Sequence, residues 1–139
     1  MRPRKFARLV AALVPFALSQ AQAADCGAAP EAAGARAESK RYTVVYRTEP
    51  AAIAVGRAFA IEVQVCAKGQ AAVPTGLRVD AQMPAHRHGM NYRPTVVAEG
   101  DGRFRAEGLL FHMPGRWELI FDLDAPGMHE RITRDLLLE

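Results

Sequence analysis

The sequence predicts an all-β protein, a single antiparallel, immunoglobulin-like β-sandwich of about seven strands. Apolar and polar residues alternate in several short segments, and glycine, proline and aspartate separate these segments. No segment shows the apolar spacing of an amphipathic helix. Short half-buried strands joined by tight turns are typical of a sandwich. The composition, 50% hydrophobic and 24% charged, excludes collagen-like, coiled-coil and low-complexity chains.

The first 23 residues predict a cleaved secretory signal peptide. A basic stretch, MRPRKFAR, precedes an apolar run over residues 9–18, and AQA ends at Ala23 in the small-x-small pattern of a cleavage site. The apolar run is about half of the roughly 20 residues that a membrane-spanning helix needs. We therefore expect no permanent membrane anchor, and a mature protein in the periplasm or outside the cell.

The charge of the chain depends on this segment. The full sequence has 18 basic and 15 acidic residues, a formal net charge of +3. Four of the basic residues lie in the expected signal peptide, so 14 remain against 15 acidic residues. No basic patch is left in the mature chain, which excludes nucleic acids and anionic membrane surfaces as the expected partners.

The two cysteines, Cys26 and Cys66, are expected to form a disulfide, because an exported protein folds in an oxidising compartment. A reactive or metal-binding thiol pair is the alternative, but no CxxC motif is present. Residues 24–41 are rich in alanine, glycine and charge without apolar periodicity, which predicts a flexible tether. The sandwich domain is then expected over residues 42–139.

Alternation defines the strands of this domain. In RAFAIEVQVC the apolar side chains share one face, and Cys66 belongs to the opposite, outward face, so the disulfide would fasten the tether across the outside of the sheet. The same pattern recurs around Leu77 and Trp117. The expected strands cover residues 42–47, 57–66, 77–83, 93–97, 103–113, 117–124 and 131–138.

One strand carries an irregularity. Within residues 103–113, Phe104 and Ala106 take inward positions, but from Leu109 onward the inward positions are shifted by one residue. A β-bulge at Gly108 would absorb this shift and keep the segment as one strand.

Strand direction then places the loops. If consecutive strands alternate in direction, the loop over residues 84–92 and the turn over residues 112–116 lie at one end of the sandwich. Met128 and His129, in the last loop, lie at the other end. Two segments far apart in the sequence are therefore expected to meet at one rim.

These two segments, MPAHRHGMNY and FHMPGRW, hold most of the histidine and methionine of the mature chain. Imidazole and thioether are ligands that copper prefers, and a thioether needs no deprotonation to bind. We expect a Cu(I) site in which His88, Met90 and His112 capture the ion and His86 or Met113 completes it. Met83 and Met113 also follow the inward alternation of their strands, so ordinary core packing is an alternative for both.

Two other functions stay open. His86, His88 and His112 are also the ligand set of a three-histidine zinc site that would activate a water molecule. A metal-free interaction module is the second alternative, since Tyr92 and two neighbouring arginines would suit a contact surface.

An enzyme is not expected. The mature chain has one serine, Ser39, in the tether, so a Ser-His-Asp hydrolase lacks its nucleophile. No glycine-rich run precedes a helix, so a phosphate-binding loop is missing.

The runs DAQMPAHRHGMNY and GRFRAEGLLFHMPGRWEL resemble the YtkA-like domain, a small secreted immunoglobulin-like module related to the FixH group. Gly115 and Trp117 match the Gly-x-Trp that opens the penultimate strand of that family. The resemblance covers roughly residues 42–138 and implies the sandwich fold. It also implies a link to copper handling or to the assembly of respiratory oxidases, with a periplasmic protein as partner. FixH-type proteins are membrane-anchored, and this chain is expected to differ in that respect.

Overall fold

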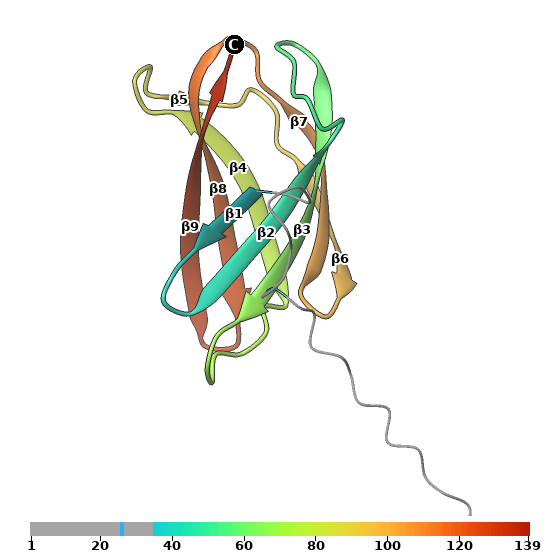
Figure 1. Ribbon diagram of the computed structural model, residues 1–139, viewed down its shortest axis with the longest axis vertical. Coiled ribbons are helices and arrows are strands. Elements are labelled where there is room, and N and C mark those ends of the chain that lie inside the picture. Colours follow the sequence, from blue (N-terminus) through green and yellow to red (C-terminus); the bar gives the residue numbers. More distant parts are fainter. Residues whose placement is uncertain (1–25, 27–34) are drawn as a thin grey trace, which may run out of the picture.

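The computed structural model describes Cys26 and residues 35–139, which form two antiparallel β-sheets packed face to face (Figure 1). The all-β sandwich predicted from the sequence is confirmed. The expected signal peptide, residues 1–23, lies outside the described residues. So does most of the expected tether.

The first sheet has the strand order β1-β2-β3-β7-β6, and the second has the order β5-β4-β8-β9. In chain order the strands are β1 (Ala35–Glu38), β2 (Tyr42–Glu49), β3 (Ala58–Ala67), β4 (Gly76–Met83), β5 (His88–Gly89), β6 (Thr95–Gly100), β7 (Arg103–Leu110), β8 (Gly115–Ala125) and β9 (Met128–Leu138).

Two short strands in the described part of the chain, β1 and β5, were not expected. β1 lies within the residues predicted to be a flexible tether, so that prediction is wrong from Ala35 onward. It pairs antiparallel with β2, Ala35 opposite Tyr46, and Ala37 is buried. The strand escapes sequence analysis because it has only four residues and its inward side chains are alanines, which give a weak apolar signal.

The alternation predicted for β3, β4 and β8 is confirmed by burial. On β3, Ile61, Val63 and Val65 are buried while Cys66 is half-buried on the opposite face. The largest fully buried side chains come from both sheets and fill the space between them: Trp117, Tyr42, Phe111, Phe121, Ile61, Met83, Leu109, Leu119, Leu123, Val44 and Val65.

The predicted bulge lies at Gly108. Phe59 pairs with Leu109 but Ile61 pairs with Ala106, so β7 accommodates one residue more than β3 over the same distance. Gly108 has φ +84°, a conformation that side chains with a Cβ rarely adopt. β7 ends at Leu110 and not at residue 113 as expected, because the chain turns towards β8 after Phe111.

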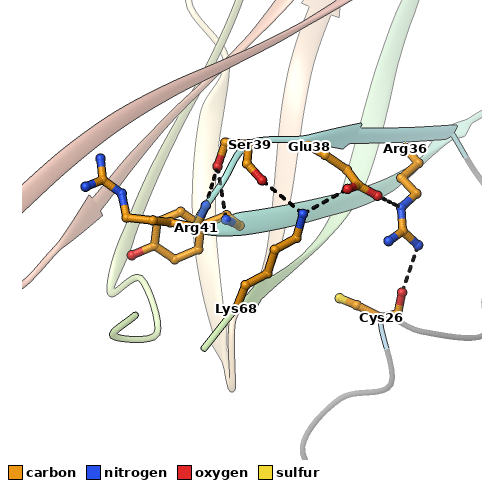
Figure 2. Close-up of polar contacts among 7 residues, drawn as sticks. Cys26, Arg36, Glu38, Ser39, Arg41 and Lys68 are labelled. Atoms are coloured by element: carbon orange, nitrogen blue, oxygen red, sulfur yellow. Dashed lines mark hydrogen bonds and ion pairs between the residues drawn. The ribbon is translucent and has the colours of Figure 1, made fainter. Parts of the chain in front are cut away.

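Cys26 and Cys66 form the expected disulfide, with their Cα atoms 6.0 Å apart. The bond fastens Cys26 to the outer side of β3, and polar contacts hold β1 nearby (Figure 2). Arg36 donates to the carbonyl of Cys26 at 2.9 Å, and Lys68 donates to Glu38 at 2.8 Å. The hydrogen bonds from Lys68 and Arg36 lower the pKa of the Glu38 carboxyl.

Removing the disulfide is expected to destabilise the domain. The bond closes a loop with a sequence separation of 40 residues, and a loop of this length is worth about 2–5 kcal/mol. The variant C26S/C66S should lose that much unfolding free energy in urea titrations, and reductant should then have no further effect on it. Equal stability of this variant and the oxidised wild type would contradict the assignment of a stabilising role.

Candidate functional site

The two histidine- and methionine-containing segments lie at the same end of the sandwich, as predicted. Figure 1 shows β5 and the start of β8 at the end where the C-terminus lies, and the β8–β9 hairpin at the opposite end. β4 leads into the first segment and β8 follows the second. These strands pair side by side, with Gln82 opposite Glu118.

The first segment folds back on β4 as a tight hairpin. The amide of His86 donates to the carbonyl of Met83 at 3.0 Å, and Arg87 takes φ +55° in the turn. The chain then returns as β5, which places His88 opposite Met83. His86 therefore lies in the turn and His88 in the returning strand, so the two histidines do not lie on one extended segment.

Met90 is held close to β4. Its amide donates to the carbonyl of Ala81 at 3.1 Å, and its side chain packs, half-buried, against the core. A Cβ atom at Gly89 would lie 3.1 Å from the same carbonyl, so glycine permits this close approach.

The second segment is built on aromatic packing. Phe111 stacks on Trp117 with ring centroids 4.5 Å apart and an interplanar angle of 20°. The indole N–H of Trp117 donates to the carbonyl of Met113 at 3.1 Å, which fixes the turn before β8. From a third segment, the amide of Gly56 donates to the carbonyl of Phe111 at 2.8 Å.

The rings of His86, His88 and His112 lie next to one another, and those of His88 and His112 contact Trp117. Ring centroids are 5.7 Å apart for His86 and His88, and 5.1 Å apart for His88 and His112. The ring of Trp117 makes edge-type contacts with both, its centroid 5.4 Å from that of His112 and 6.1 Å from that of His88. The predicted meeting of the two segments is thus a property of the fold.

The spacing of His88 and His112 suits two ligands of one ion. With metal–nitrogen bonds of about 2 Å, two imidazoles on a tetrahedral ion have ring centroids roughly 5 Å apart. Nδ1 of His88 lies 3.2 Å from the carbonyl oxygen of Gly89. Because a carbonyl only accepts, Nδ1 carries the hydrogen, which leaves the lone pair on Nε2. Histidine ligands are commonly oriented by such a backbone hydrogen bond.

His112 has a different signature. Its Nδ1 is buried and has no hydrogen-bond partner among the described residues. Leaving such an atom unsatisfied costs about 1–3 kcal/mol. The imidazole of His112 therefore does not stabilise the described chain through a hydrogen bond from this nitrogen.

The methionines divide into two groups. Met83 is 1% exposed and belongs to the core, as its alternation suggested, and a Cβ at Gly115 would lie 2.9 Å from its Cε. Met90 and Met113 are only partly buried and lie on the two converging segments. Met90 and Met113 are therefore the methionines at this rim that stay partly exposed.

The described residues hold no group of three or more His, Cys, Asp or Glu side chains arranged to bind a metal ion. This finding weighs against a preformed three-histidine zinc site. His129, the fourth histidine, lies at the opposite end and pairs with Asp124.

Trp117 was expected only as a core residue of its strand and as part of a family motif. The contacts of its ring with His88 and His112 were not predicted. The signal was present, because Met113 precedes it by four residues across a Pro-Gly turn, a spacing that lets the indole reach back to the turn.

A family model described as YtkA-like matches residues 36–122, and the chain belongs to this family. Neither the curated proteins nor the solved structures contain a match to the chain. Over Cys26 and residues 35–139, no helix is long and apolar enough to span a membrane.

Replacing His112 should not destabilise the metal-free protein. His112→Phe keeps a ring against Trp117 and removes the unsatisfied nitrogen, so the unfolding free energy should stay equal or rise by about 1 kcal/mol. Urea unfolding of the two metal-free proteins measures this difference. A loss above about 2 kcal/mol would show that the imidazole has a structural role.

Proposed function

We propose that the protein is a secreted Cu(I)-binding carrier, buffer or delivery partner. His88, Met90 and His112 supply the ligands, and His86 or Met113 completes the site or exchanges within it. The observation that carries this proposal is the 5.1 Å approach of the His88 and His112 rings from two separate segments, each segment also carrying a half-buried methionine.

The ligand chemistry favours Cu(I). Imidazole and thioether are neutral, and thioether is a soft ligand that suits Cu(I) better than a hard dication. The site lies over Trp117 and Phe111, which give it an apolar base. A monovalent ion is less costly to bring to such surroundings than a divalent ion when the ligands carry no compensating charge.

The rim also suits transfer of the ion. His86 is exposed on the hairpin turn, while His88, Met90 and His112 are half-buried behind it. An exposed imidazole next to a partly buried set allows stepwise ligand exchange with a partner. The signal-peptide pattern supports a periplasmic location, where such a partner in copper handling or oxidase assembly would be met.

A metal-free interaction module is the second candidate. Tyr92 is 57% exposed beside the hairpin, and Arg87 and Arg93 are exposed on either side of it. Exposed tyrosine and arginine are typical of protein contact surfaces.

A competition titration tests the copper proposal. Purified metal-free protein competes with a chromogenic Cu(I) chelator under reducing agents that leave the disulfide intact. We expect one Cu(I) per chain and a dissociation constant well below micromolar. H88A and M90A should each weaken binding by about tenfold or more. Each removes one metal–ligand bond worth several kcal/mol, and a water molecule that takes the empty position offsets only part of this loss.

The opposite end of the sandwich supplies matched controls. M128A and H129A remove the same residue types away from the rim and should leave Cu(I) affinity unchanged. Affinity no tighter than micromolar would contradict the proposal, as would equal affinity of H88A, M90A and the wild type. Zinc bound as tightly in M90A as in the wild type would favour the zinc alternative.

A further inference from the structure

The outermost strand of the first sheet, β6, has an edge that no described residue pairs. Within the described chain its ladder partner is β7 alone, and the strand lies at the outer side of its sheet (Figure 1). Val97 is 59% exposed, and Thr95 and Glu99 are exposed with it. An exposed edge strand offers unpaired backbone N–H and C=O groups to another strand.

The sequence of this edge is complementary to itself. β6 is regular from Thr95 to Ala98, Arg93 precedes it, and its pairing with β7 is irregular between Ala98 and Gly100. An antiparallel pairing of two copies centred on Val96 places Thr95 opposite Val97 and brings Arg93, at one end of the paired segment, to the end where Glu99 of the other copy lies. Residues directly opposite in an antiparallel ladder point to the same face of the sheet. The pairing would therefore create two Arg93–Glu99 ion pairs, one on each side of the twofold axis.

Arg93 and Glu99 take no part in the ion pairs that the described residues form on this face of the sheet. Arg105 on β7 bonds Glu49, Glu62 and Glu107. Arg93 and Glu99 form no ion pair with any described residue. Arg103 lines the same shallow hollow as Glu99 and is the alternative partner for it, but no ion pair joins them.

We propose that β6 pairs antiparallel with β6 of a second copy of this chain, in the register centred on Val96. The five-stranded sheets of the two copies then form one continuous sheet. The contact is isologous and uses the same edge of both copies, so it closes at a dimer. One strand pair is a small interface, so the dimer is weak and depends on concentration. Pro94 and the single charges disfavour other registers, which limits open-ended association.

Sedimentation velocity over a concentration series, on the metal-free protein with its disulfide intact, tests this inference. The wild type should shift from monomer to dimer as concentration rises. R93E and E99R should each weaken dimerisation at least about tenfold, because each places like charges opposite each other twice. The charge-swapped variant R93E/E99R should restore it, which a merely misfolded variant would not do.

Arg103→Gln is the matched control and should leave the dimer unchanged. A wild type that is monomeric up to about millimolar protein would overturn the inference. So would a dimer that E99R does not weaken, or a charge-swapped variant that fails to restore association. The experiment contains no copper, so its failure is separate from failure of the metal proposal.

Discussion

The antiparallel pairing of β4 with β8 is the constraint on which the rim depends. It places the end of β4 beside the beginning of β8, with Gln82 opposite Glu118. The segments that follow β4 and precede β8 must then leave the sheet at the same point. Trp117, fully buried two residues into β8, extends this constraint by stacking on Phe111 and holding the carbonyl of Met113. Convergence of the histidines follows from strand register and one aromatic anchor.

The strands could be predicted where side-chain chemistry alternates strongly. β3, β4 and β8 each bury one row of large apolar residues, and the shift at Gly108 was visible because Leu109 breaks the alternation set by Phe104. β1 could not be predicted, since it has only four residues and its inward side chains are alanines, which give a weak apolar signal. β5 has two residues, and only its pairing with β4 makes it a strand.

The site was predictable in outline but not in its hydrogen bonding. Counting strand directions was enough to place His88 and His112 at one end, because the argument needs only an antiparallel order. The fold supplies what the sequence cannot express: the Gly89 carbonyl that leaves Nε2 of His88 as the lone-pair atom, and the unsatisfied Nδ1 of His112. The orientation of His88 depends on the turn between Met83 and His88, and apolar alternation does not determine the conformation of a turn.

X-ray absorption spectroscopy of the Cu(I)-loaded protein tests the central claim most directly, because it identifies the atoms bound to the ion. The account predicts a mixed shell of nitrogen at about 2.0 Å and sulfur at about 2.3 Å, by analogy with zinc bond lengths. The sulfur contribution should fall in M90A. A shell of nitrogen or oxygen alone would show that the thioethers are packing residues and would contradict a shared His and Met site at this rim.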